Sequence, residues 1–152
     1  SLFFVITQYE NHQSRLASEL QEQKEKAKIE AIFQAYKQNP QNPQNIIAIG
    51  MQALYDKEDN YHQKYDKYPS DYIKEAIDNH PLFLPAYKKM IELTQDIAYQ
   101  SFYDYYGTEK GYSNDISLYP ATEKRYAQKA LRLDETGQLK LSQNDKSFFK
   151  KA

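Results

Sequence analysis

Apolar and polar residues follow a helical period along most of the chain. In residues 11–38 the period is carried by four apolar side chains with charged residues between them, namely Leu16, Leu20, Ala27 and Ala31. The pattern predicts one long helix that ends before Pro40, because proline disfavours helix at the residue preceding it. Its second half, residues 29–36, is the more apolar and is expected to be buried. Its first half is expected either to project from the core or to pair with another helix.

Prolines and glycines divide the rest of the chain into further helices. Asn42 and Pro43 form a cap and first position for a second helix. Four tyrosines follow at intervals of four, three and four residues, and they would share one face if the segment were helical throughout: Tyr61, Tyr65, Tyr68 and Tyr72. Pro69 and Ser70 are expected to break the run, with Ser70 capping a separate helix that contains Tyr72. Such a stripe usually packs on a neighbouring helix. Three more helices are expected over residues 71–79, 85–107 and 122–133, with Gly107 capping the second of them.

Residues 103–120 differ in character from the rest of the chain. Two glycines, an Asn-Asp pair and a closing proline predict a long irregular loop, and loops of this length are usually functional or disordered. Five tyrosines lie in it: Tyr103, Tyr105, Tyr106, Tyr112 and Tyr119. The chain is therefore expected to consist of an anchor- or stalk-like helical segment (1–28), a helical domain carrying the aromatic loop (29–137) and a C-terminal tail (138–152) that is packed or frayed.

Composition favours an all-α protein. Fifteen tyrosines accompany only four glycines, and the strand-forming pattern is poor. The net charge of −1 argues against a general nucleic-acid partner, since such binding relies on a basic surface. The absence of cysteine excludes a disulfide framework, a thiolate metal site and a cysteine nucleophile.

The first residues, 2–6, are strongly apolar, and the sequence begins without methionine. Two interpretations are open: the end of a signal peptide or membrane anchor, or an apolar terminus that packs on the domain. The anchor is slightly favoured, which would associate the protein with a membrane or place it in the envelope or periplasm. No segment reaches the roughly 20 apolar residues that cross a bilayer.

Candidate chemistry is sparse. His62 with Asp59 and Asp66 is the only conceivable metal site, but zinc sites use three or four dedicated ligands, so no metal and no cofactor is expected. No nucleophile motif or phosphate-binding loop is present. An enzyme or glycan-binding protein would depend on acids beside the loop tyrosines, namely Asp104, Glu109 and Asp115. A non-enzyme is therefore expected.

The helix ends resemble those of tetratricopeptide repeats. In that family a helix closes with a small residue, an apolar residue and, five positions after the small one, proline. The matching sets are Ala35-Tyr36-Pro40 with Ile46, Ile49 and Gly50 after it, Ala76-Ile77-Pro81 with Tyr87 and Met90 after it, and Ala130-Leu131 with Glu135 in place of proline. The three alanines lie 41 and 54 residues apart, against ~34 in the family. Lys28, Pro69 and Glu123 stand where a small residue opens the second helix. A generic orthogonal helical bundle is the alternative.

The resemblance implies antiparallel helix hairpins stacked as a short solenoid, with a long N-terminal helix and a tyrosine-rich loop. Family members bind extended peptides on a concave face. Carried over by position, that face would hold Gln44, Ile47, Met51, Leu54 and Tyr55 on one helix, and Lys88, Glu92, Gln95 and Asp96 on the next. The first set is apolar and could instead be part of the core, whereas the second is charged and more typical of a groove. The implied function is a non-catalytic module that binds a protein or peptide, a class that includes small immunity or inhibitor proteins. Its binding residues would be Tyr55, Lys88, Glu92, Gln95, Tyr103, Tyr105, Tyr106 and Tyr112.

Overall fold

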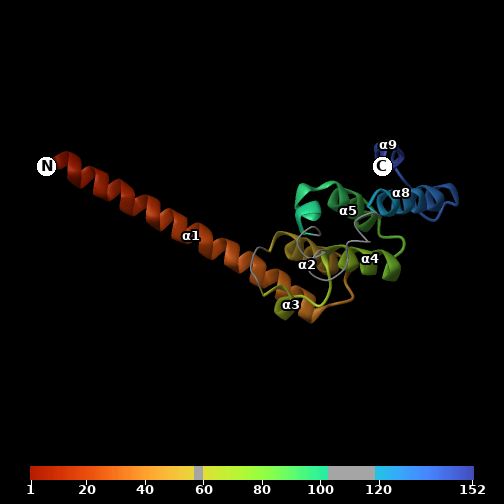
Figure 1. Ribbon diagram of the computed structural model, residues 1–152, viewed down its shortest axis with the longest axis horizontal. Coiled ribbons are helices and arrows are strands. Elements are labelled where there is room, and N and C mark those ends of the chain that lie inside the picture. The colour runs from red at the N-terminus through yellow and green to blue at the C-terminus, as the bar shows by residue number, and fades with distance from the viewer. Residues whose placement is uncertain (57–59, 103–118) are drawn as a thin grey trace.

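The computed structural model describes residues 1–56, 60–102 and 119–152, and these residues form helices and no strands. The helices are α1 (Leu2–Gln38), α2 (Pro43–Tyr55), α3 (Tyr61–Lys64), α4 (Pro69–Asn79), α5 (Leu84–Gln95), α8 (Tyr119–Glu135) and α9 (Gln143–Lys151), as labelled in Figure 1. Further helical turns cover residues 97–102. The predictions of an all-α protein and of a long N-terminal helix are both confirmed.

Short polar side chains and prolines set the helix ends. The Asn42 side chain accepts a hydrogen bond from the Gln44 amide at 2.9 Å, and Pro43 occupies the first turn of α2 as predicted. The Ser142 hydroxyl caps α9 by accepting from the Asp145 amide at 3.1 Å. After α8 the chain turns through Gly137, whose φ of 75° is the left-handed conformation that glycine adopts without strain.

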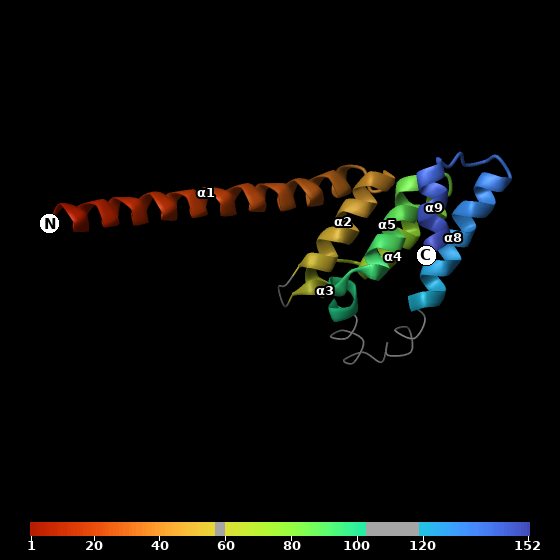
Figure 2. The same ribbon diagram turned by 90° about the horizontal axis from the view of Figure 1, so that it is seen from above.

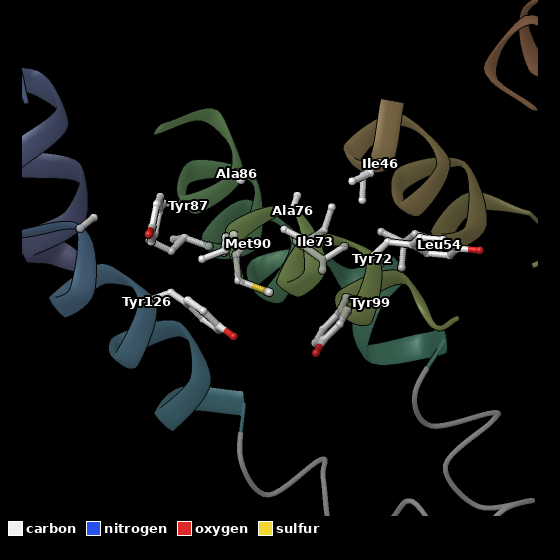
Figure 3. Close-up of a cluster of buried hydrophobic side chains, with 14 of the residues drawn as sticks. Ile46, Leu54, Tyr72, Ile73, Ala76, Ala86, Tyr87, Met90, Tyr99 and Tyr126 are labelled. Atoms are coloured by element: carbon white, nitrogen blue, oxygen red, sulfur yellow. The ribbon is translucent and has the colours of Figure 1, made fainter. Parts of the chain in front are cut away.

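Successive helices pack against one another. α2 contacts α1 and α4, α5 contacts α4 and α8, and α8 contacts α9, while α2 also touches α5. Figure 2 shows these helices side by side in a row that begins at the inner end of α1. Ala76 and Ala130, the small residues of two of the family-like helix ends, are both fully buried. Figure 3 shows part of the continuous core that results.

α1 extends far beyond the domain (Figure 1). Residues 1–28 are exposed along their whole length, and only the inner end, through Ile32, Phe33 and Tyr36, packs against the core. Within this chain the first half projects from the core, which was one of the two expected arrangements. The alternative that the apolar residues 2–6 pack on the domain is wrong, because Phe3 is 80% exposed. Helix α1 already includes residue 2, whereas the sequence pattern predicted a helix from residue 11, and the Ser1 hydroxyl accepts a hydrogen bond from the Phe4 amide.

Two expected helices are interrupted. The expected break at Pro69 is present, since α4 begins there, but the preceding helix is also broken: α2 stops at Tyr55 and α3 is a single turn. The helix expected over 85–107 breaks at Asp96, whose carboxylate accepts from the Ala98 amide at 2.9 Å and so caps the turns that follow. The C-terminal tail is a packed helix rather than a frayed end, with Phe149 only 1% exposed.

We predict that Gly50→Ala destabilises the domain. A Cβ at this position of α2 would lie 2.8 Å from Cβ of Tyr72 and 3.2 Å from the carbonyl oxygen of Pro69, both on α4. Neither atom can move without shifting a helix. Overpacking costs about 1–3 kcal/mol, against about 1 kcal/mol gained in helix propensity. Urea unfolding should show a net loss, whereas Gln44→Ala, on the exposed side of α2, should change stability by less than about 0.5 kcal/mol. A Gly50→Ala protein as stable as the parent would refute the close approach.

We also predict that Phe149→Ala lowers the free energy of unfolding by about 3–5 kcal/mol, because the ring is fully buried and its removal leaves a cavity. The neighbouring ring of Phe148 is only half-buried. Phe148→Ala is therefore the matched control and should cost clearly less in the same urea titration. Equal losses for the two variants would show that α9 does not dock as described.

Candidate functional site

Lys88, Glu92 and Gln95 lie on one side of α5, because residues spaced by four and three positions share a helix face. The structure brings the end of α2 to the end of this row: the Tyr55 hydroxyl donates to Oδ2 of Asp96 at 2.5 Å. This hydrogen bond holds the pKa of Asp96 below its usual range and raises the pKa of Tyr55. Tyr55 nevertheless stays 51% exposed, so its ring is oriented while its surface remains open.

Lys88 and Glu92 have different surroundings. The ammonium of Lys88 lies 2.6 Å from Oδ1 of Asp145 and so joins α5 to α9, and this ion pair lowers the pKa of Asp145. Glu92 is exposed and pairs with Lys89 of the same helix at 2.9 Å. Lys88 therefore helps to dock α9 and marks the edge of the exposed row, which is formed by Glu92 and Gln95.

The residues carried over to α2 are mostly not on an open face. Leu54 is buried, and Ile47 and Met51 are half-buried against the core. Of the two possibilities for this apolar set, a groove wall or part of the core, these three residues belong to the core, because α2 lies between α1 and α4 and its apolar residues are used in that packing. Gln44 and Tyr55, at the two ends of the helix, are the exposed members of the set.

A cleft of about 400 Å³ lies around α3, and the family resemblance did not indicate it. The cleft is lined by Tyr61, His62, Tyr65, Asp66, Lys67, Tyr68 and Asp71. The aromatic rings form a cluster: the centroid of Tyr61 lies 4.8 Å from that of Tyr65, 6.0 Å from that of Tyr68 and 5.2 Å from that of Phe102. Such spacings are those of favourable aromatic pairs.

Hydroxyl groups fix the walls of this cleft. The Tyr61 hydroxyl donates to the Lys67 carbonyl oxygen at 2.6 Å, and the Asp66 amide donates to the Tyr72 hydroxyl at 3.0 Å. The Tyr65 hydroxyl donates to the Asp56 carboxylate at 2.7 Å, and Lys64 reaches the same carboxylate at 3.3 Å. Burial, followed by this carboxylate, raises the pKa of Tyr65 far above its usual value. The Tyr65 hydroxyl is thus a neutral hydrogen-bond donor that ties the segment after α3 to Asp56 at the end of α2.

The rim of the cleft carries charge of both signs. Asp66, Asp71 and His62 are exposed, and the Lys67 ammonium lies 3.0 Å from Glu75 and 5.4 Å from the centre of the Tyr72 ring. In the described part of the chain no three His, Asp or Glu side chains come together in a way that could hold a metal ion. Asp59, the third member of the predicted weak metal site, lies outside the described residues. The cleft offers aromatic faces and hydrogen-bonding groups.

The remaining candidates fall in residues 103–118, outside those that the structure describes. They are the loop tyrosines Tyr103, Tyr105, Tyr106 and Tyr112, and the acids of the enzyme alternative, Asp104, Glu109 and Asp115. Both predictions about them remain predictions. The signal for the α3 cleft was present in the sequence as the four spaced tyrosines. Sequence reasoning separated Tyr72 from the others at Pro69 but did not detect that the chain also leaves the helix after Tyr55.

These observations define an all-α domain of sequentially packed helices carried at one end of a long exposed helix. Comparison of the chain with protein families, characterised proteins and solved structures found no significant match. Over the ranges 1–56, 60–102 and 119–152, no helix combines the length and the apolar character needed to cross a membrane.

We predict that Tyr65→Phe destabilises the protein by about 1–3 kcal/mol, because it removes a hydrogen bond to the Asp56 carboxylate, which is only 8% exposed. Tyr9→Phe is the matched control, since Tyr9 lies on the projecting part of α1 and is 64% exposed, so that its hydroxyl is open to solvent. The control should leave urea unfolding unchanged. A Tyr65→Phe protein with parental stability would show that the hydroxyl does not hold the α3 segment.

Proposed function

We propose that the domain is a non-catalytic module that binds an extended peptide or a protein segment, built as a short and divergent solenoid of the tetratricopeptide type. The sequential packing of α2, α4, α5 and α8 supports the proposed solenoid, as does the contact between α2 and α5, which are the first helices of the two proposed repeats. Gly50 in close contact with α4, and the buried Ala76 and Ala130, occupy family positions that require small side chains.

The observation that carries the proposal is the surface formed by Glu92 and Gln95 on α5 beside the exposed, hydrogen-bonded ring of Tyr55. A tyrosine whose orientation is already fixed loses little entropy when a ligand covers it. The polar side chains next to it can exchange hydrogen bonds with a peptide backbone. The proposed binding surface also includes the tyrosines of residues 103–120, and their contribution is tested separately from that of α5.

A random-peptide library selected on the parent protein should yield ligands that bind it specifically. Glu92→Ala combined with Gln95→Ala should weaken these ligands by about tenfold, which corresponds to about 1.4 kcal/mol. Lys74→Ala combined with Asp78→Ala removes an exposed ion pair on α4 and should leave affinity unchanged. Replacing Tyr103, Tyr105, Tyr106 and Tyr112 by alanine reports on the loop independently.

Affinities can be measured by fluorescence polarisation, with circular dichroism confirming that each variant is folded. The proposal fails if the library yields no specific ligand, or if the α4 control loses as much affinity as the α5 variant. If only the loop variant loses binding, the ligand site is the loop and the α5 surface is not part of it.

A further inference from the structure

The outer part of α1 packs against no other segment in the described part of the chain, yet it exposes large apolar side chains. Leu2, Tyr9, Leu16 and Leu20 are between 43% and 77% exposed. An isolated helix in water gains little stability from its own hydrogen bonds, and most helical stability in proteins comes from the packing of an apolar face against a neighbour. These two facts indicate a surface that is covered in the assembled protein.

Most of the large apolar residues of this segment follow a heptad pattern, with Phe4 lying outside it. Successive seam positions alternate at intervals of four and three residues and comprise Leu2, Ile6, Tyr9, Gln13, Leu16, Leu20, Gln23 and Ala27. A repeat that averages 3.5 residues keeps one stripe facing a partner helix in a left-handed coiled coil. Phe3 and Val5 flank the seam at its outer end. The pattern extends over nearly four heptads, well past the apolar tip at residues 2–6.

The seam points away from the domain. At 100° per residue, its positions centre about 180° around the helix from Ile32, Phe33 and Tyr36, the residues through which α1 packs on the core. Tyr36, for example, meets Tyr72 of α4 with ring centroids 6.0 Å apart. A helix laid along the seam would therefore not collide with the domain that α1 already carries.

We propose that two copies of this chain pair through the α1 seam as a parallel two-stranded coiled coil. In a parallel pair the same residue of each copy meets across the seam, so Gln13 meets Gln13 and Gln23 meets Gln23, and each amide can hydrogen-bond to its equal. In the antiparallel pair with the same overlap, Gln13 would oppose Leu16 and Gln23 would oppose Ile6. That arrangement would bury amides against apolar side chains, which costs free energy.

The charged residues of α1 also favour a second copy of this chain as the partner. Glu19 and Lys24 occupy the flanking positions that face each other between the strands of a parallel coiled coil, so a dimer would gain two such pairs. Residues 1–28 contain four acidic and four basic side chains, which are Glu10, Glu19, Glu22, Glu25, Arg15, Lys24, Lys26 and Lys28. This balance gives no net attraction to anionic lipid, as the basic face of a membrane-surface helix would.

The first test is the mass of the full 152-residue chain in solution, by analytical ultracentrifugation at micromolar concentrations. The parent should be a dimer. Leu16→Glu combined with Leu20→Glu should weaken the dimer by more than about tenfold in Kd, since it places four negative charges in the seam. Ser14→Glu combined with Ser18→Glu adds the same charge at the same spacing on the opposite side of α1 and should remain dimeric. A parent that is monomeric, or a control that dissociates equally, overturns the proposal.

The second test fixes the orientation. The chain has no cysteine, so Ala27→Cys introduces a single thiol, which should form an intermolecular disulfide on mild oxidation if the strands are parallel. In the antiparallel pair the two thiols would be about 37 Å apart. Ser18→Cys, on the outer side, is the control that should not cross-link.

Sedimentation with phosphatidylcholine–phosphatidylglycerol vesicles completes the test. A parent that remains monomeric and pellets with vesicles would show that the apolar end of α1 binds lipid instead. A dimer that cross-links through residue 27 and does not pellet supports the coiled coil.

Discussion

The close approach of α2 to α4 at Gly50 is the contact on which the rest of the domain depends. Tyr72 and Pro69 lie where a side chain on residue 50 would be, so the two helices can interlock only because that position has none. α4 in turn packs against α5, and α5 packs against α8. The missing side chain at residue 50 thus sets the spacing of the helix pair to which the later helices of the row are joined.

Tyrosine shapes the region between α2 and α4. A ring of this size fills a core as phenylalanine would, but its hydroxyl must find a partner when it is buried. Tyr61, Tyr65 and Tyr72 find theirs in backbone groups and one carboxylate of the α3 segment. The requirement explains why this segment folds as a single turn held by hydroxyls rather than as a continuous helix, and why a cleft with aromatic walls and a polar rim is left beside it.

The exposed helix and the proposed binding surface become related if both proposals hold. A parallel coiled coil would place two domains at the same end of a shared stalk, each with its own Tyr55, Glu92 and Gln95 surface. Two weak sites on one particle bind a ligand with two matching segments, or a partner that is itself repeated, much more tightly than either site alone. Modest affinity at each surface would then be sufficient for a stable complex.

The sequence by itself determined the helical class, the ends marked by Pro43, Pro81 and Gly137, the long first helix, and the burial of Ala76 and Ala130. These follow from local propensity, capping and hydrophobic period, which act over a few residues. Only the tertiary structure decided that the tyrosine segment breaks at Asp56 and the following helix at Asp96. The Asp56 carboxylate accepts a hydrogen bond from Tyr65. The Asp96 carboxylate accepts one from Tyr55, on another helix, and one from the Ala98 amide beyond the break. It also decided that Lys88 docks α9 and that Leu54 faces the core rather than a groove. Those outcomes depend on which helix lies next to each side chain, and that information is not local in sequence.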